Sequence, residues 1–307
     1  MLIEPSGINR SALKEWLADC YQLRIADLCL MPVGADSFNY HAIDTDLRSW
    51  FVNCRRSAPV ARLHGDLAAL ERSYHVAWAL RDAAGLSFLS CPIPSRTDTL
   101  ASSFGGLPVS VFPFLEGRAG WAETSEEQTA LLASVRALHN ATPVVRRCRP
   151  SVETFEPTFE FPLTKALARV PNLDASVGPF AARLKRSLAA HHAYLLERLA
   201  RFHALRSAVL AEGPADWVIT HGEPAWNVIW GPSGHTIVDC GELWLAPPER
   251  DLFLFENAGG RPDRRELYDL RWLLSEVAEY ATQFSEPHSG TAEDERAWAD
   301  LVQYLPY

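Results

Sequence analysis

Residues 218–253 read VITHGEPAWNVIWGPSGHTIVDCGELWLAPPERDLF, a series of short apolar runs separated by polar loops. Turn residues bound these runs, so the pattern predicts strands joined in hairpins. Polar side chains stand where two neighbouring strands end: Glu223 and Asn227 follow the first, and Asp239 follows the third. A glutamate can accept a proton, while amide and carboxylate oxygens are ligands that Mg²⁺ prefers. The stretch therefore outlines a site for phosphoryl transfer.

The composition predicts a cytoplasmic protein with one large bilobal domain or two domains. A chain of 307 residues with 48% apolar and 22% charged residues is long for one core and otherwise ordinary. Its formal charge of −9 argues against nucleic acid and anionic membranes as partners and suits a cationic small molecule. The six cysteines have no CxxC spacing, which favours reduced thiols over a zinc site. We see no signal pattern and no apolar run of 18 residues.

Residues 1–114 are expected to form a small nucleotide-binding lobe with an antiparallel sheet. Helices are predicted over 8–21 and 67–84, and strands over 25–33, from about 39, and over 49–54, 86–94 and 107–114. The turn at Gly34 could cradle a phosphate through backbone N–H groups, but an ordinary hairpin turn is the favoured interpretation of a single glycine. The expected fold class is α+β.

Residues 115–307 are expected to form a mostly helical lobe that carries the catalytic loop and the substrate site. A helix capped at Thr124 should run to about His139, and an exposed loop should follow over 141–160. Two helices are predicted within 163–212, broken near Pro171, and further helices over 264–284 and 292–304.

Ordered motifs run through most of the chain. They are GADSFNY at 34–40, SWFV at 49–52, FPF at 112–114, LH at 138–139, HGxxxxN at 221–227, IVD at 237–239 and LAPxERDL at 245–252. With these motifs the chain resembles the aminoglycoside phosphotransferase family, and most of all its spectinomycin phosphotransferase branch. The resemblance implies a bilobal kinase-like fold that uses ATP and Mg²⁺ to phosphorylate a hydroxyl of a small, aminocyclitol-like molecule.

The resemblance also implies a role for individual residues. Glu223 stands where the family has an aspartate that deprotonates the substrate hydroxyl. Asn227 and Asp239 would hold Mg²⁺, while His221 and Asp251 would support the catalytic loop. The candidates for nucleotide binding, including the hinge that would receive adenine, are Asp36, Ser37, Asn53, Arg55, Phe112, Phe114 and Leu115. The candidates for substrate contact are Trp226, Glu242, Trp244 and Glu276.

The phosphate-binding site departs from the family pattern. The third strand should carry a lysine that binds the α- and β-phosphates, but Asn53 occupies that position. Arg55 lies two residues further on, so it shares a strand face with Asn53 and could supply the charge. On sequence alone, a surface arginine at a strand end is the simpler interpretation. Without the lysine, the nearest helix glutamate, Glu71, has no evident partner and is expected to be solvated.

The catalytic loop departs from the pattern as well. Glu223 in place of aspartate moves the carboxylate by one methylene, roughly 1.5 Å, and such a displacement can cost about 10²-fold in rate. Asp239 is followed by Cys240-Gly241-Glu242, whereas the family has an aromatic residue and then an aspartate. Pro224 stiffens the loop, and Trp226 replaces a small residue.

Three interpretations remain open from the sequence. The first is an ATP-dependent small-molecule kinase that serves in antibiotic resistance or biosynthesis, with Glu223 as base. The second is a kinase-fold protein that has lost phosphoryl transfer and binds a metabolite, or catalyses different chemistry in the cleft between its lobes. The third is an unrelated α/β binding module whose loop carboxylates are ordinary caps and turns.

Overall fold

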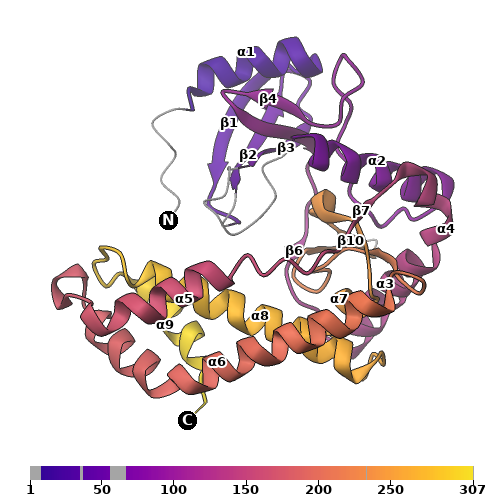
Figure 1. Cartoon of the computed structure of the whole chain (residues 1–307). Helices are drawn as coiled ribbons and strands as arrows, with labels where there is room; N and C mark the ends of the chain where they lie inside the picture. The colour runs from indigo at the N-terminus through magenta and orange to yellow at the C-terminus, as the bar shows by residue number, and fades with distance from the viewer. Residues whose placement is uncertain (1–7, 35–36, 56–66, 233, 307) are drawn as a thin grey trace. The chain divides into compact units, whose positions relative to one another are not determined.

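The computed structural model describes residues 8–34, 37–55, 67–232 and 234–306 (Figure 1). The chain divides into two compact units. The first unit comprises Met1–Glu153 and Asp216–Gly259, and the second comprises Thr154–Ala215 and Gly260–Tyr307. The expected lobes, 1–114 and 115–307, follow a different criterion and stay a prediction, because the first unit takes segments from both.

The first unit contains both strands and helices. In chain order they are α1 (Arg10–Tyr21), β1 (Ile25–Met31), β2 (Ser37–Asp44), β3 (Ser49–Arg55), α2 (Leu67–Ala83), β4 (Ser102–Phe104), β5 (Leu107–Pro113), β6 (Arg118–Ala119), α3 (Ser125–Asn140), α4 (Thr142–Val145), the 3₁₀ helix η1 (Arg146–Cys148), β7 (Ser151–Val152), β8 (Val218–Thr220), β9 (Val228–Gly231), β10 (Gly234–Ile237), the 3₁₀ helix η4 (Cys240–Glu242), β11 (Trp244–Ala246) and α7 (Glu249–Leu252).

Strands β1 to β5, which come after α1 in the chain, form one sheet in the order β1-β2-β3-β5-β4. Each neighbouring pair of strands is antiparallel. Side chains alternate between its faces, as the strand period requires. Val52 and Cys54 of β3 belong to the same buried cluster as Leu13 and Leu17 of α1, and Figure 1 shows that helix along the sheet. The expected α+β class with an antiparallel sheet near the N-terminus is confirmed.

The opposite face of this sheet packs on α2. Phe51 of β3 and Phe112 of β5 join Leu70 and Tyr74 of α2 in a second apolar cluster, in which the Phe112 and Tyr74 rings meet edge to face with centroids 5.7 Å apart. Position 51 faces α2 while positions 52 and 54 face α1. Asn53 and Arg55 therefore start from the α2 face of the sheet.

The predicted strand over 86–94 is wrong. The segment is irregular and forms an isolated parallel bridge between Leu89 and Ile237. Pro92 and Pro94 lack the N–H groups that a ladder needs, so the apolar run fills a core instead of extending the sheet. Leu86, Leu89 and Cys91 pack with α3 and the central strands.

The loop expected over 141–160 instead contains α4, η1 and β7, and its end already belongs to α5. These short elements are held by contacts far along the chain. The Thr142 hydroxyl donates to the His139 carbonyl oxygen at 2.6 Å and accepts from the Ile219 N–H at 2.9 Å. Local sequence patterns do not show a hydrogen-bond partner so far along the chain. The sequence alone therefore predicts an exposed loop for this segment.

The stretch 218–253 contributes to two small sheets, ordered β10-β9-β6 and β7-β11-β8. The β9–β10 hairpin is confirmed, with Val228 opposite Ile237. The expected hairpin pairing of β8 with β9 is wrong, because β8 pairs antiparallel with β11. Residues 221–227 therefore pass from one sheet to the other.

The second unit is helical, as the sequence predicts. Its elements are α5 (Glu160–Arg169), the 3₁₀ helices η2 (Val170–Asn172) and η3 (Ala175–Val177), α6 (Ala181–Glu212), α8 (Pro262–Gln283) and α9 (Ala292–Gln303). Aromatic pairs fill its core: Phe159 meets Phe202 edge to face with ring centroids 5.1 Å apart, and Phe180 stacks on Trp298 at 5.5 Å. Over the described residues, the helices are all too short or too polar to cross a bilayer.

The expectation that Glu71 is solvated is wrong. Its carboxylate, on α2, accepts from the buried backbone N–H of Leu100 at 2.9 Å and of Ala101 at 2.7 Å. Replacing Glu71 with alanine leaves these two N–H groups without that acceptor, so we expect the free energy of unfolding to fall by about 2 kcal/mol. Urea unfolding measures this, with Arg72→Ala on the exposed side of α2 as the control. Equal midpoints for the two variants would contradict it.

Candidate active site

The loop between β8 and β9 is closed by its own backbone. The N–H groups of Trp226 and Asn227 both donate to the carbonyl oxygen of Glu223, at 3.3 and 3.2 Å. The amide nitrogen Nδ2 of Asn227 donates to the same oxygen at 3.2 Å. Because that nitrogen is the donor, Oδ1 is the Asn227 atom that can bind a cation. The turn therefore fixes the spacing between the Glu223 and Asn227 backbones.

Asp251, in α7, anchors the start of this loop and is fully buried. Its carboxylate accepts from the backbone N–H of His221 at 3.0 Å and of Gly222 at 2.6 Å, and from Nε2 of His139 at 2.8 Å. Burial alone would raise the pKa of Asp251. The His139 hydrogen bond and the charges of His139 and Arg250 outweigh burial, so the pKa lies below its usual value. An ionised carboxylate thus holds the start of this loop.

His221 links the loop to the strand that precedes Asp239. Its Nδ1 accepts from the Glu223 N–H at 3.4 Å, and its Nε2 lies 2.8 Å from the Val238 carbonyl oxygen. This pattern assigns the proton to Nε2. The Val238 N–H in turn donates to the Asn227 carbonyl oxygen at 2.9 Å. Asn227 and Asp239 consequently lie together at the open end of the β9–β10 hairpin.

Asp239 adopts a left-handed backbone with φ 58° and ψ 48°, which aspartate tolerates better than most residues. Its side chain is 51% exposed, and its Oδ1 accepts from Nη2 of Arg55 at 2.8 Å. Arg55 is 8% exposed, so its interpretation as a surface arginine is wrong. The strand places it on the α2 face, and the aspartate supplies the opposite charge that a buried guanidinium requires.

The residues present fit a magnesium ion that the nucleotide would also bind. In the parts of the chain that the structure describes, no group of three His, Cys, Asp or Glu side chains could hold a metal ion alone. Mg²⁺ commonly takes one or two protein oxygens and completes its shell with phosphates and water. Oδ1 of Asn227 and the half-exposed Asp239 carboxylate provide such a pair.

Two candidates for nucleotide binding, Ser37 and Asn53, belong to a chain of polar side chains on β2 and β3. Nδ2 of Asn53 donates to Oδ1 of Asn39 at 2.7 Å, and Nδ2 of Asn39 donates to Oγ of Ser37 at 3.0 Å and to the Val33 carbonyl oxygen at 2.8 Å. Asn39 and Asn53 are paired across β2 and β3. Sequence reasoning missed Asn39 as the centre of this chain, and the strand register was the missing information. Asp36 lies outside the described residues.

The hinge candidates occupy different environments. Phe112 is 7% exposed and packs on Tyr74, so any contact with a nucleotide falls to its backbone. Phe114 packs on His41 with ring centroids 4.2 Å apart, and its N–H donates to the Ser49 carbonyl oxygen at 3.1 Å. Leu115 is half-buried just beyond β5.

The substrate candidates have different surroundings. Trp226 is exposed and meets the exposed Trp121 edge to face, with ring centroids 4.0 Å apart. Sequence reasoning missed Trp121, which lies in the loop after β6. Glu242 and Trp244 instead surround the buried Arg250, with Nη2 of Arg250 3.6 Å from Oε2 of Glu242 and its guanidinium 4.8 Å from the Trp244 ring.

Arg250 explains the glycine in the loop between β8 and β9. Its Nη1 donates to the Thr220 hydroxyl at 3.0 Å and to the Glu242 carbonyl oxygen at 3.1 Å. Gly222 has a φ of 106°, and a Cβ atom there would lie 2.6 Å from Nη2 of Arg250. Glycine is therefore required both for the turn and for the space beside the guanidinium.

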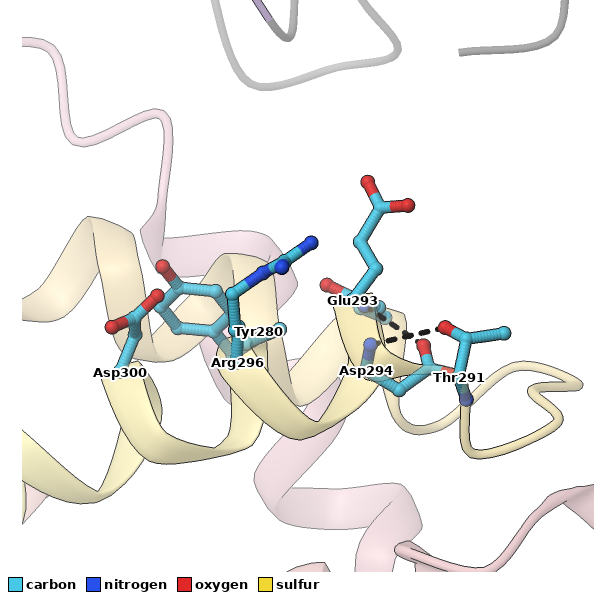
Figure 2. Close-up of a pocket in the computed structure, with 8 residues that line it drawn as sticks. Tyr280, Thr291, Glu293, Asp294, Arg296 and Asp300 are labelled. Carbon is cyan, nitrogen blue, oxygen red and sulfur yellow. Dashed lines mark hydrogen bonds between the residues drawn. The ribbon is translucent and has the colours of Figure 1, made fainter. Parts of the chain in front are cut away.

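The fourth substrate candidate, Glu276, lies on α8 in the second unit, one turn before Tyr280. Burial raises the pKa of Tyr280, and the charge of Glu276 adds to this. Tyr280 lines an open depression of about 380 Å³ between α8 and α9 (Figure 2). Thr291 and Asp294 exchange capping hydrogen bonds beside it, at 2.8 and 3.1 Å, and none of the predicted site residues lines it.

Comparison with known proteins identifies the family. The model of the phosphotransferase enzyme family matches residues 27–281. The chain belongs to this family. The chain is also 32% identical over 289 residues to Protein StrN of Streptomyces griseus, an alignment that covers 90% of this chain and 85% of StrN. The resemblance found in the sequence is confirmed.

Solved structures show the fold of this chain. The spectinomycin phosphotransferase APH(9)-Ia in complex with ADP and spectinomycin has a TM-score of 0.73 at 18% identity, covering 98% of this chain and 95% of that one. Amicoumacin kinase hAmiN in complex with AMP-PNP, Ca²⁺ and Ami has a TM-score of 0.58 at 11% identity, covering 97% of this chain and 92% of that one. The kinase-like fold is confirmed, and the interpretation as an unrelated α/β binding module is wrong.

Proposed function

We propose that this phosphotransferase uses ATP and Mg²⁺ to phosphorylate a hydroxyl group of a small, aminocyclitol-like molecule. The observation that carries the proposal is the common anchoring of three side chains. Asp251 holds the start of the loop that bears Glu223 and Asn227, and His221 ties the same loop to the residue before Asp239. The same backbone contacts thus position the proposed base and the two proposed metal ligands, and phosphoryl transfer depends on such positioning.

The chain's own groups have distinct tasks in this proposal. The Glu223 carboxylate accepts the proton that leaves the substrate hydroxyl. Asn227, through Oδ1, and Asp239 would hold Mg²⁺. When bound, ATP supplies the phosphoryl group and Mg²⁺ offsets the charge of its phosphates. The fold relatives solved with ADP and with AMP-PNP and Ca²⁺ support a nucleotide and a divalent cation as ligands.

Charge and aromatic surface support the proposed class of substrate. A formal charge of −9 favours a cationic ligand, and the exposed Trp121–Trp226 pair beside Asn227 offers faces on which an ammonium-bearing ring can lie. The relative solved with spectinomycin supports an aminocyclitol.

All six cysteines are free thiols, which supports a reducing compartment, and we place the protein in the cytoplasm.

A second candidate function is nucleotide or metabolite binding without phosphoryl transfer. It is favoured by Asn53, which is neutral where the family has a lysine and whose side chain is bound to Asn39. A kinase whose phosphate site had lost its cation would keep the fold and lose turnover.

Thermal unfolding tests the proposal. With Mg-ATP at about 100 times its dissociation constant, mass action stabilises the folded state by about 2.7 kcal/mol, and we expect the melting temperature to rise by about 5 °C. Asp239→Asn should reduce the shift with Mg-ATP but not with adenosine. Release of ADP in the presence of a spectinomycin-like aminocyclitol then measures turnover. No shift at millimolar ATP would overturn the proposal, whereas a shift without turnover on any aminocyclitol would favour the second candidate.

A further inference from the structure

The side chain of Arg55 crosses from the sheet to the metal-binding end of the site. It starts on the α2 face of β3, two positions after Asn53, and its Nη2 lies 2.8 Å from Oδ1 of Asp239. Its side chain is 10% exposed, whereas that of Asp239 is 51% exposed. The Arg55 side chain is thus largely buried and lies beside a half-exposed carboxylate.

Gly241 makes room for this guanidinium. Its φ is not in the positive range, so the backbone conformation does not require glycine there. A Cβ atom at position 241 would lie 2.8 Å from Nη1 and 3.1 Å from Nη2 of Arg55, and 3.0 Å from Cδ1 of Leu70. Any larger residue would displace the guanidinium. Gly241 thus leaves space for the guanidinium of Arg55, the cation on the same strand face as Asn53.

The position of the guanidinium is suited to phosphate. Mg²⁺ held at Asp239 shares its shell with phosphate oxygens, so a cation within 2.8 Å of that carboxylate lies where nucleotide phosphates are expected. A guanidinium is always charged, weakly hydrated and able to bind phosphate oxygens with two parallel N–H groups. Asn53, whose Nδ2 donates to Asn39, brings no charge to the same face.

We propose that Arg55 replaces the missing strand lysine and binds the nucleotide phosphates from beside Asp239. The proposal rests on the proposed function, because it requires a nucleotide in this site. The alternative is that Arg55 only neutralises Asp239 and does not contact the ligand. The two roles differ in what Arg55 contributes to phosphate affinity as opposed to adenosine affinity.

Isothermal titration calorimetry of ADP and adenosine, each with Mg²⁺, separates these roles without turnover. We expect Arg55→Gln to weaken ADP binding about 10- to 100-fold, the range for a lost charged hydrogen bond, and to leave adenosine within about twofold. Arg48→Gln is the matched control: it removes an exposed arginine just before β3 and should leave both affinities unchanged. An unchanged ratio of ADP to adenosine affinity in Arg55→Gln would overturn the inference.

Two further variants keep the test decisive if Arg55→Gln does not fold. Gly241→Ala displaces the guanidinium while Arg55 stays, and should weaken ADP but not adenosine. Arg55→Lys should lose less ADP affinity than Arg55→Gln, because it keeps the charge and loses the planar contact. Wild-type affinity for ADP in Gly241→Ala and equal adenosine binding would also reject the inference. If the wild type binds neither ligand, the proposed function itself fails, and the inference with it.

Discussion

Glu223→Gln is expected to lower kcat by about 10²- to 10⁴-fold, the usual contribution of a positioned general base. Glutamine keeps the size of the side chain but cannot take the proton from the substrate hydroxyl. The loop itself should persist, because the Glu223 carbonyl oxygen and N–H that close its turn are kept in the variant. We therefore expect little change in the melting temperature or in the affinity for ADP.

The pH–rate profile identifies the role of Glu223 more sharply than a single rate. The wild type should lose kcat/KM at acid pH as its base is protonated, and Glu223→Gln should lose this limb of the profile. Asp82→Asn, at an exposed position of α2, removes a carboxylate elsewhere and should retain wild-type kinetics. A Glu223→Gln enzyme within about threefold of wild-type kcat would show that another group is the base.

Glu223→Asp asks whether the loop has adapted to the longer side chain. Aspartate retracts the carboxylate by roughly 1.5 Å, so we expect kcat to fall by about 10²-fold although aspartate is the family's residue. Pro224 and Trp226 differ from the family pattern in the same loop, and the Trp226 N–H closes the turn onto Glu223. A gain in kcat on this change would mean that glutamate is a defect and not an adaptation.

Sequence patterns correctly predicted the structural elements that are determined by interactions between residues close in sequence. The α1 helix begins after Asn9, whose side chain accepts from the Ser11 N–H at 2.9 Å, and α3 begins after Thr124, which accepts from Glu127. In both helices, the capping side chain and the N–H group that it accepts from lie within three residues of each other. The spacing of HGxxxxN likewise reflects one turn of backbone, closed between Glu223 and Asn227. Such features lie within a sequence window.

The sequence could not show which distant residues meet. Arg55 and Asp239 are 184 positions apart, and only the fold reveals that one neutralises the other. Glu71 read as a solvated helix residue because its partners are N–H groups at positions 100 and 101, which have no side-chain signature. Trp121 and Trp226 meet because β6 pairs with β9. In each case, the sequence shows the type of side chain but not which distant residue it contacts in the folded chain.

Asp251→Asn is expected to lower the free energy of unfolding by about 3–5 kcal/mol at neutral pH, because it removes the charge from a fully buried, paired carboxylate. The amide keeps one acceptor oxygen, but its nitrogen faces N–H donors from His221, Gly222 or His139. An unpaired buried donor costs more than the hydrogen bond that is lost. Urea unfolding at pH 7 measures the difference, with Asp82→Asn as the exposed control.

The pH dependence of this difference follows from the depressed pKa of Asp251. Because the folded pKa lies below the unfolded value of about 3.9, the stabilisation is complete well above that value. It is lost as the pH falls through the folded pKa, where both wild type and variant carry a neutral side chain. The gap between them should therefore be widest at pH 7 and should narrow towards pH 3. A gap under about 1 kcal/mol at pH 7, or one that widens in acid, would show that other contacts hold the catalytic loop.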